Sequence, residues 1–251
     1  KILEHYGYEV IAPASGYLAC GDTGAGKMPE PETLLAYIER EIAWEKDLAG
    51  KKILVTAGPT QEAIDPVRYI TNHSSGKMGY AIAKVAMLRG ADVTLVSGRT
   101  AIEPPLFVKT VPVVTARDMY EAVTSVSDEQ DVIIKAAAVA DYRPACVSSE
   151  KVKKSEGQMS IELERTDDIL KYLGEHKRPG QFLCGFSMET QNMLSNSRAK
   201  LTKKNLDMVA ANNVKTEGAG FQGDTNVLTL ITQDEEVSLP LMSKEDAAAK
   251  I

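Results

Sequence analysis

The chain has 251 residues, a net charge of −6 and an apolar content of 43%, with an isoelectric point of about 5.3. This acidic balance argues against a non-specific nucleic-acid or membrane-surface role, because both need an excess of positive charge. Three cysteines without CxxC spacing and three histidines give neither a disulfide framework nor a zinc motif. Since no run approaches about 18 uncharged apolar residues and no signal-peptide pattern opens the chain, we expect a cytoplasmic protein without a membrane span.

The first fifty residues differ in character from the rest. They contain the motif PASG (13–16), the glycine-rich run GDTGAGKM (21–28) and, at 31–47, the apolar periodicity of an amphipathic helix. Some thirty residues ahead of this helix cannot bury a core of their own. The sequence therefore predicts the end of another domain, a linker helix and a main domain, at residues 1–30, 31–50 and 51–251.

From Lys52 onward, short apolar strands alternate with amphipathic helices. The predicted strands are residues 52–57, 92–97, 131–138, 181–187 and 207–212, and the predicted helices are residues 77–89, 116–126 and 192–204. Continuous apolar strands between helices are typical of a parallel sheet covered on both faces. Two later runs, 226–232 and 236–241, flank a polar turn before a last helix that begins at Ser243. The sequence thus predicts an α/β fold: a Rossmann-like three-layer domain with a mostly parallel sheet, plus a C-terminal β-hairpin.

Residues 52–79 have the pattern of an anion-binding site. A β-branched strand ends at Gly58, a long polar loop follows, and a helix begins at Ser74-Ser75-Gly76. The first amides of a helix lack internal partners and lie at the positive end of its dipole. A plain strand-to-helix connection needs only about 2–6 residues, so this longer loop favours a nucleotide or phosphorylated-metabolite site over a solvated loop. Its polar residues include Asp65, Arg68, Asn72 and His73.

Further candidate ligand groups follow the third predicted strand. Small alanines at the carboxyl end of a strand let a planar base approach the backbone, and ligands of open α/β sheets bind at that edge. Asp141 comes next and could accept hydrogen bonds from an amino group or a ribose hydroxyl. The lysines of the loop at 147–158 could bind phosphate, as could Lys200 and Lys204 at i, i+4 on one helix, but both sets could equally be solvated surface. Phe186 could stack on a base or pack in the core.

Six motifs, taken in order, resemble one known family. They are AGPTQEAIDPVRYITNHSSGKMG (57–79), AAAVADYRP (136–144), EKVKK (150–154), GFSMET (185–190), KKNLDMVAAN (203–212) and GFQGDTN (220–226). From about Leu48 onward the chain is similar to the ligase half of the bacterial bifunctional phosphopantothenoylcysteine decarboxylase/phosphopantothenate–cysteine ligases of coenzyme A biosynthesis. Residues 1–30 resemble the last part of the decarboxylase half, with its PASG motif and its substrate-clamp loop.

The resemblance implies a reaction with three substrates. The carboxylate of 4′-phosphopantothenate attacks the α-phosphate of CTP, giving an acyl-cytidylate and pyrophosphate, and the amine of cysteine then displaces CMP. Mg²⁺ is expected to accompany the triphosphate and to bridge its phosphates. Asn72 matches the family residue that turns over the acyl-cytidylate, and Lys151 matches the residue that forms it. Cys20 matches the proton donor of the decarboxylase, but without the FMN-binding body upstream we expect no decarboxylation from this chain.

The same resemblance implies a CTP pocket and a homodimer. The pocket residues are Lys135, Ala136, Ala137, Asp141, Lys151, Asp167, Asp168, Ile169, Leu170, Phe186, Lys200 and Lys204. The family commonly has Asn-Pro-Asp where this chain has Thr166-Asp167-Asp168, which leaves the backbone part of that contact better supported than the side-chain part. No metal ligands can be assigned from the sequence. Family ligase domains assemble as dimers, and an exposed hairpin edge at 226–241 agrees with pairing.

Two rival functions stay open on the residues alone. An NAD-linked dehydrogenase fits the sheet pattern, but the first strand ends in AGPT rather than GxGxxG, and no acidic residue closes the second strand at Val96-Ser97-Gly98. A non-catalytic nucleotide-binding module fits the same helix entry. Because such a module releases no pyrophosphate from CTP, that release separates it from the ligase.

Overall fold

The computed structural model describes residues 2–154, 158–189, 191–213 and 220–251. The chain divides into two compact units, Lys1–Glu45 and Lys46–Ile251. Residues 155–157 of the predicted lysine loop and Thr190 of the GFSMET motif lie outside the described residues. Within the described ranges, no helix combines the length and the apolar character needed to cross a membrane.

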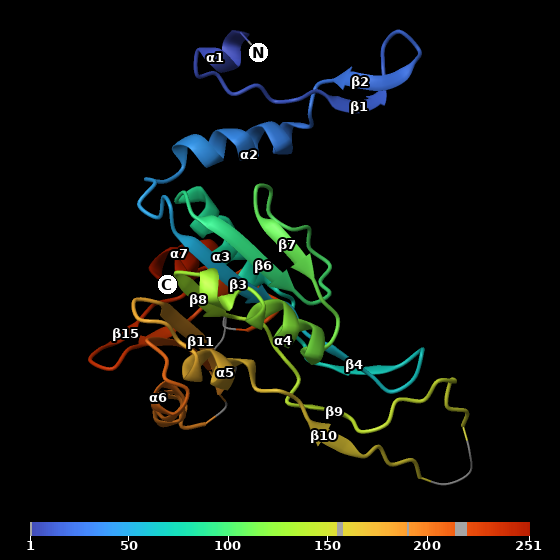
Figure 1. Cartoon of the computed structure of the whole chain (residues 1–251), viewed down its shortest axis with the longest axis vertical. Coiled ribbons are helices and arrows are strands. Elements are labelled where there is room, and N and C mark those ends of the chain that lie inside the picture. Colours follow the sequence, from blue (N-terminus) through green and yellow to red (C-terminus); the bar gives the residue numbers. More distant parts are fainter. Residues whose placement is uncertain (1, 155–157, 190, 214–219) are drawn as a thin grey trace. The chain divides into compact units, whose positions relative to one another are not determined.

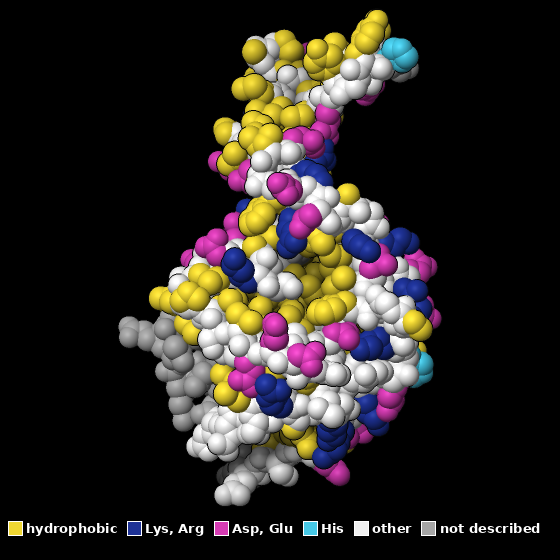
Figure 2. Space-filling view, turned by 90° about the vertical axis from the view of Figure 1, so that its left-hand side faces the viewer, with side chains coloured by type: hydrophobic (Ala, Val, Ile, Leu, Met, Phe, Trp, Pro, Cys, Tyr) yellow, Lys and Arg dark blue, Asp and Glu magenta, His cyan; other side chains and the backbone are white. Residues whose placement is uncertain are grey.

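The first unit consists of short elements without a buried core. It contains α1 (Ile2–His5), a hairpin of β1 (Ala14–Tyr17) and β2 (Thr23–Lys27), and α2 (Pro31–Ile42). None of its described residues is buried, and Figure 2 shows hydrophobic side chains crowded on its surface. The helix predicted for 31–47 is shorter than expected, because the apolar stripe that predicted it stops at Ile42. The assignment of residues 1–30 to another domain stays a prediction.

The second unit is built around an eight-stranded sheet (Figure 1). The strand order is β15–β14–β12–β11–β8–β3–β6–β7, with parallel pairing from β12 to β7 and an antiparallel hairpin of β14 and β15 added at the β12 edge. This confirms the predicted mostly parallel sheet and the C-terminal hairpin. The strands are β3 (Lys52–Ala57), β6 (Asp92–Ser97), β7 (Lys109–Pro112), β8 (Val132–Lys135), β11 (Phe182–Glu189), β12 (Met208–Asn213), β14 (Thr229–Ile231) and β15 (Glu236–Ser238).

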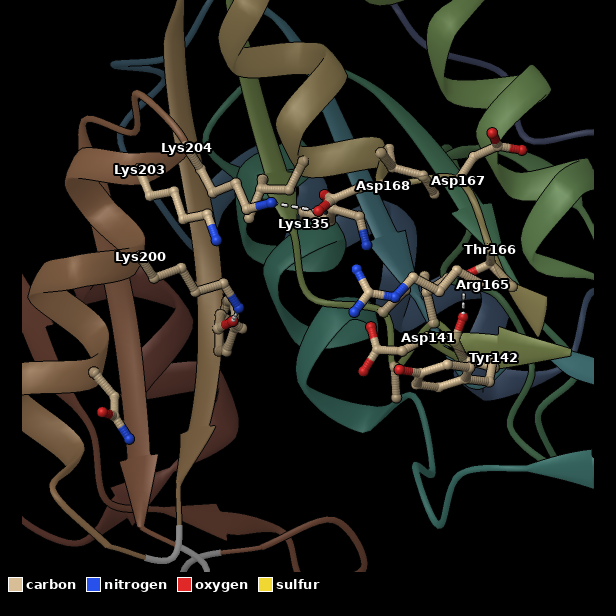
Figure 3. Close-up of a pocket in the computed structure, with 18 of the residues that line it drawn as sticks. Lys135, Asp141, Tyr142, Arg165, Thr166, Asp167, Asp168, Lys200, Lys203 and Lys204 are labelled. Atoms are coloured by element: carbon tan, nitrogen blue, oxygen red, sulfur yellow. Dashed lines mark hydrogen bonds and ion pairs between the residues drawn. The ribbon is translucent and has the colours of Figure 1, made fainter. Parts of the chain in front are cut away.

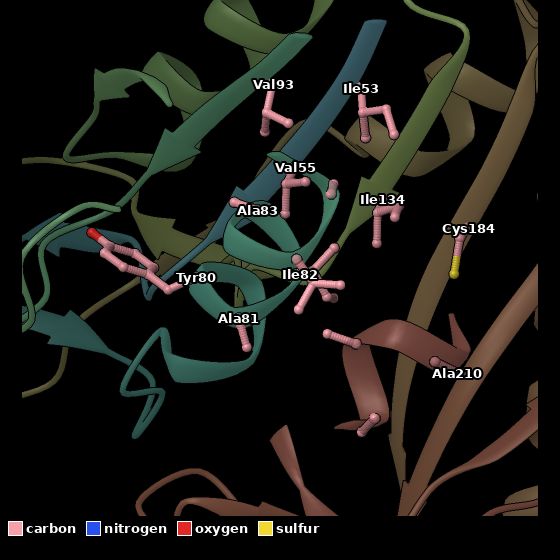
Figure 4. Packing of buried hydrophobic residues seen from close by; sticks show 14 of the residues in the cluster. Ile53, Val55, Tyr80, Ala81, Ile82, Ala83, Val93, Ile134, Cys184 and Ala210 are labelled. Carbon is pink, nitrogen blue, oxygen red and sulfur yellow. The ribbon is translucent and has the colours of Figure 1, made fainter. Parts of the chain in front are cut away.

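Helices cover both faces of this sheet, which confirms the predicted three layers. One face carries α3 (Lys77–Leu88) and α7 (Lys244–Lys250), and the other carries α4 (Ala116–Thr124), the short 3₁₀ helix η1 (Ser127–Glu129), α5 (Ile169–Glu175) and α6 (Met193–Lys203). Side chains alternate along a strand, so Val55 packs with α3 whereas Leu54 packs in the cluster on the opposite face. Figure 4 shows Ile82 of α3 directed at the strands that carry Val55 and Ile134.

Several short strands were not predicted from the sequence. They are β7 and the paired strands β4 (Gln61–Ala63) with β5 (Tyr69–Thr71), β9 (Tyr142–Pro144) with β10 (Leu163–Arg165), and β13 (Thr225–Asn226) with β16 (Met242–Ser243). A strand of two to four residues is too short to form the continuous apolar run from which the other strands were predicted. Conversely, the strand predicted for 131–138 ends at Lys135, so residues 136–138 lie in the loop at its carboxyl end.

Close packing of α3 on β3 depends on Gly79. A Cβ at this position would lie 2.6 Å from the Cβ of Ala57 and 2.9 Å from the carbonyl oxygen of Thr56. A helical Gly→Ala change gains up to about 1 kcal/mol of helix propensity, but overpacking a core costs about 1–3 kcal/mol. We expect Gly79→Ala to lower the free energy of unfolding by about 1 kcal/mol, measured by urea denaturation.

The matched control is Gly24→Ala, because the nearest atom to a Cβ there lies 3.9 Å away. This change is expected to leave the urea midpoint unchanged. A Gly79→Ala protein as stable as the parent would show that α3 and β3 can separate without cost.

Candidate functional site

The loop after β3 returns to the sheet and begins α3 with a glycine in the left-handed conformation. Gly76 has a φ of 80° and precedes Lys77, the first helical residue. The Oγ atoms of Ser74 and Ser75 accept hydrogen bonds from the amides of Gly76 (3.3 Å) and Lys77 (3.4 Å). A Cβ on Gly76 would lie 2.6 Å from Cγ2 of Thr100. The serine turn, as we call residues 74–76, therefore needs glycine at its last position.

Asn72 lies where the loop after β3 meets the loop after β8. Its Nδ2 donates a hydrogen bond to the carbonyl oxygen of Ala138 at 3.0 Å. The same carbonyl accepts from the amide of Thr60 (3.3 Å), and the amide of Ala138 donates to the carbonyl of Gly58 (3.0 Å). The predicted catalytic amide is thus fixed beside the alanines predicted to contact a nucleotide.

A cavity of about 810 Å³, here called the large cavity, opens at the carboxyl end of β8, next to Phe186 of β11. In Figure 3, Lys200, Lys203 and Lys204 extend from one side of it, and Arg165 and Asp141 lie on the other. The structure therefore brings together most of the predicted nucleotide pocket. The predicted residues that line it are Lys135, Ala137, Asp141, Asp167, Asp168, Ile169, Leu170, Phe186, Lys200 and Lys204.

Two lysines of this cavity are already bonded to protein groups. The Nζ of Lys200 donates to the carbonyl oxygen of Phe186 at 2.6 Å. The Nζ of Lys204 forms an ion pair with the carboxylate of Asp168, whose other oxygen accepts from the amide of Lys171 (2.9 Å) and so caps α5. Burial opposes the charge of Asp168, but the bonds from Lys204 and Lys171 outweigh it and hold its pKa below the ordinary value.

Lys135 is the last residue of β8, and its side chain lines the large cavity. Burial disfavours the ammonium form, and the neighbouring ammonium of Lys200 disfavours it further. Together they lower the pKa of Lys135 to about 8, although Asp168 and Asp141 act in the opposite direction. A lysine with this pKa changes its charge close to neutral pH.

The remaining predicted pocket residues contribute in different ways. Asp167 pairs with Arg117 of α4 at 3.2 Å, whereas Ile169 and Leu170 are buried in the core beneath the cavity wall. The carbonyl oxygen of Asp141 accepts from the amide of Thr166 at 3.1 Å, which joins the two loops while the Asp141 side chain stays exposed. The side chain of Thr166 also joins the loops, since its Oγ1 donates to the carbonyl oxygen of Ala140 at 2.6 Å.

Lys151 is not among the residues that line the large cavity. Its loop is anchored at the next residue, since Val152 donates its amide to Oδ2 of Asp65 (3.1 Å) and accepts from Arg68 (2.7 Å). The Asp65 carboxylate also accepts from the guanidinium and amide of Arg68, and these bonds hold its pKa well below the usual range. Cys20 belongs to the first unit, where it is exposed.

A second space of about 140 Å³, here called the small cavity, adjoins the large one. Its walls include the serine turn, Ala136 and the buried residues Asn212 and Lys244. It shares Ala137, Ala138 and Phe186 with the large cavity. Phe186 thus lies at the boundary between the large and the small cavity. Its position in an apolar strand did not indicate this role.

Some residues of these cavities escaped the sequence analysis. Arg165 and Lys203 line the large cavity, and Lys77 and Lys244 line the small one. Arg165 ends the unpredicted strand β10, so nothing marked it as a cavity residue. Lys203 neighbours Lys204 in a run of helical lysines that could have included it. Lys77 and Lys244 each open a helix, a position that by itself suggests only solvent exposure.

A parallel sheet between two helix layers, with a cavity at the carboxyl ends of its strands, places this protein among Rossmann-like α/β proteins, which bind ligands at that edge. Residues 48–251 match the family model described as DNA/pantothenate metabolism flavoprotein C-terminal domain. The chain belongs to this family. The resemblance identified from the six motifs is confirmed.

Similar proteins agree with this assignment. The coenzyme A biosynthesis bifunctional protein CoaBC of Bacillus subtilis (strain 168) is 49% identical over 100% of this chain, which spans 63% of that protein's length. The crystal structure of the C-terminal domain of a CoaBC protein has 50% identity and a TM-score of 0.69, covering 81% of this chain and 92% of that one. A Cab2 mutant in complex with phosphopantothenate-cysteine has 17% identity and a TM-score of 0.67, covering 87% and 91%, and shares the fold.

Proposed function

We propose that this chain is a ligase of coenzyme A biosynthesis that joins 4′-phosphopantothenate to cysteine with CTP. The observation that carries the proposal is the junction of two cavities at Ala137 and Ala138, next to the amide of Asn72. Two ligands bound in adjoining spaces would bring their reactive ends together there. The similarity to CoaBC proteins supports a role in coenzyme A biosynthesis, and the two cavities are where we propose that the substrates bind.

The large cavity suits a nucleoside triphosphate. Its volume of about 810 Å³ falls in the range of small-molecule sites, and its lysines supply the positive charge that a triphosphate needs. Figure 3 shows Asp141 at the opposite side, where its carboxylate could accept hydrogen bonds from a base edge. We propose that CTP lies with its cytosine toward Asp141 and its phosphates toward the lysines.

The small cavity, with a volume of about 140 Å³, suits the phosphate end of the second substrate. Lys77, Met78 and Gly79, the first residues of α3, line this space, and an anionic group at the start of a helix is stabilised by the helix dipole. We propose that 4′-phosphopantothenate binds here through its phosphate and extends its carboxylate toward Ala138. The α-phosphate of CTP would meet that carboxylate beside Asn72.

The proposed reaction has two steps. The carboxylate oxygen bonds to the α-phosphorus of CTP while the bond to the β-phosphate oxygen breaks, so pyrophosphate leaves and an acyl-cytidylate remains. The amine of cysteine then bonds to the acyl carbon, CMP leaves with the electron pair of the broken bond, and the amine proton passes to solvent. The chain's contribution is positioning and charge stabilisation, with Lys151 serving the first step and Asn72 the second.

Magnesium fits this scheme through the substrate. Among the described residues, no three histidine, cysteine, aspartate or glutamate side chains gather to hold a metal ion. Mg²⁺ at a triphosphate is commonly bound by one or two carboxylates together with the phosphates. Asp168, which lies beside Lys204 on the cavity wall, is a carboxylate that could serve in this way, and the ion would neutralise the phosphates.

The deciding experiment is pyrophosphate release from CTP, measured with and without 4′-phosphopantothenate and cysteine. The proposal expects release that requires 4′-phosphopantothenate, and a clear preference for CTP over ATP and GTP, because a wrong base leaves buried polar groups unpaired. A non-catalytic module would release none, and a dehydrogenase would instead reduce or oxidise NAD. Equal turnover with ATP would overturn the assignment of the cytosine site.

The affinity for CTP should fall as the pH rises through the pKa of Lys135. That pKa is lowered to about 8, so the side chain is mainly charged at pH 7 and mainly neutral at pH 9. A bound triphosphate favours the charged form, and deprotonation one unit above the pKa therefore weakens binding about tenfold. Calorimetric titration of CTP between pH 7 and pH 9 measures this change.

The control for this pH series is Lys135→Met, which removes the titrating ammonium from the cavity wall. Its CTP affinity should be weaker at pH 7 and nearly flat up to pH 9. If the CTP affinity of Lys135→Met still falls with pH as steeply as that of the parent protein, another group causes the pH dependence.

We also propose that the chain forms a homodimer. The outer strand of the hairpin, β15, ends the sheet and leaves its edge unpaired within the described residues. An unpaired edge invites pairing with a second chain, and most oligomers of one chain are two-fold dimers. Sedimentation velocity at micromolar concentration should give a dimer, and a monomer alone would contradict the proposal.

A further inference from the structure

The segment from Gly220 to Asp224, here called the strap, lies against the serine turn and forms part of the wall of the small cavity. Gly220 and Phe221 line that cavity together with Ser75 and Lys77. The Oγ of Ser75 donates to the carbonyl oxygen of Phe221, and the side-chain amide of Gln222 donates to the carbonyl oxygen of His73 at 3.3 Å. The strap therefore faces the loop that carries Asn72 and the serine turn.

A buried lysine holds the other side of the strap. Lys244, the first residue of α7, is only 5% exposed. Its Nζ donates to three backbone carbonyl oxygens of the strap, those of Gly220 (3.1 Å), Phe221 (3.2 Å) and Gly223 (2.5 Å). An ammonium group has three donors, and here all three are used on one short segment.

Lys77 adds bonds from the start of α3. Its Nζ donates to the carbonyl oxygen of Gln222 (2.8 Å) and pairs with the carboxylate of Asp224 (2.6 Å). The backbone amide of Lys244 also donates to the carbonyl of Asp224 at 2.9 Å. The strap is consequently fixed between the first turns of two helices, one of which begins at the serine turn.

The burial of Lys244 needs a reason, because taking an ammonium out of water is costly unless it is fully bonded. Burial and the nearby ammonium of Lys77 lower the pKa of Lys244, whereas Asp224 favours its charge. A hydrophobic residue could fill the same space at the start of α7 without this cost. What a hydrophobic residue could not do is bind three carbonyl groups and so fix the backbone of the strap.

We propose that Lys244 is a positioning residue that holds the strap as the outer wall of the small cavity and thereby sets the affinity for the substrate bound there. The inference rests on the proposed function in naming that substrate as 4′-phosphopantothenate. Lys244 acts through the strap, since its own donors are occupied by backbone carbonyls. The large cavity does not include the strap or Lys244 among its lining residues, so CTP binding should be much less affected.

The first test separates the two substrates. Lys244→Met keeps the length of the side chain but removes its charged donors. The loss of these charge-assisted hydrogen bonds destabilises the bonded conformation of the strap. We expect the KM for 4′-phosphopantothenate to rise about tenfold to hundredfold, with the KM for CTP changed less than about threefold. Glu245→Gln is the matched control, because it breaks the adjacent pair with Lys84 (2.8 Å) without touching the strap.

The second test does not depend on ligase activity. Chymotrypsin cleaves after aromatic residues, and Phe221 lies within the strap. We expect cleavage after Phe221, identified by mass spectrometry of early fragments, to be about tenfold faster in Lys244→Met than in the parent or in Glu245→Gln. Lys77→Met removes the bonds from the α3 side and should also accelerate this cleavage, so it serves if Lys244→Met does not fold.

The outcomes distinguish the inference from the proposed function. If the parent protein releases no pyrophosphate but the strap still opens in Lys244→Met, the proposed function fails while the holding role of Lys244 stands. Unchanged cleavage after Phe221 overturns the holding role. Faster cleavage with equal rises in both KM values, or with neither changed, overturns the link between the strap and the small cavity.

Discussion

Replacing Lys151 with glutamine is expected to lower the rate of pyrophosphate release from CTP by about 10²–10³-fold, the usual loss for one transition-state donor. In the proposed reaction, negative charge grows on the departing pyrophosphate, and a lysine that meets it stabilises the transition state. Lys151 is exposed, and its loop is anchored one residue away, where Val152 bonds to Asp65 and Arg68. Quenched single-turnover mixtures analysed by mass spectrometry measure the acyl-cytidylate directly.

Lys153→Gln is the matched control for this variant, because it removes the same charge from an exposed position in the same loop. Lys153→Gln should retain most of the rate of pyrophosphate release. If only the total positive charge of the loop mattered, both variants would be slowed alike. Accumulation of the acyl-cytidylate in Lys151→Gln would mean that this lysine serves the second step instead.

Asn72→Asp is expected to form the acyl-cytidylate and to release pyrophosphate once, but to transfer the acyl group to cysteine about 10²–10³ times more slowly. The Nδ2 of Asn72 now donates to the carbonyl of Ala138 at 3.0 Å. A carboxylate at this place cannot donate there and repels both the carbonyl oxygen and the phosphoryl group of the intermediate. Burst amplitude and steady-state rate of pyrophosphate release separate the two steps.

The two variants should therefore give opposite patterns, with intermediate present in Asn72→Asp and absent in Lys151→Gln. A burst of one pyrophosphate per active site, followed by slow turnover, is the signature expected of Asn72→Asp alone. If neither step slows in Asn72→Asp, the hydrogen bond to Ala138 is structural only.

The layered fold could be predicted because its strands and helices carry strong local signals. The continuous apolar run at Ile53–Val55 is typical of a strand buried on both faces, and the apolar stripe of α3 shows the helical period over several residues. The short paired strands of the domain, such as β9 and β10, could not be predicted in this way. β10 consists of Leu163-Glu164-Arg165, all exposed, and such a strand is defined only by its pairing with β9.

The site was predicted through its motifs, but its pairings depend on the tertiary fold. The i, i+4 spacing of Lys200 and Lys204 correctly places both at one cavity, yet nothing in it shows that Lys204 is paired with Asp168, thirty-six residues earlier. Lys244 is a similar case, because a lysine after an N-terminal cap usually reaches solvent. Its burial arises only when the strap packs over it.

Because Lys204 is paired with Asp168, an anion that binds Lys204 must compete with this carboxylate. A ligand that takes Lys204 must displace a carboxylate that is tethered to the chain and also bonded to α5. Which anion binds Lys204 depends on the difference in binding free energy between the competing anions. A monovalent ion such as chloride would bind little more strongly than the carboxylate already in place. A polyvalent phosphate can engage Lys135 and Lys203 as well while it replaces Asp168. We therefore expect monovalent anions to compete less well than a polyvalent phosphate for Lys204.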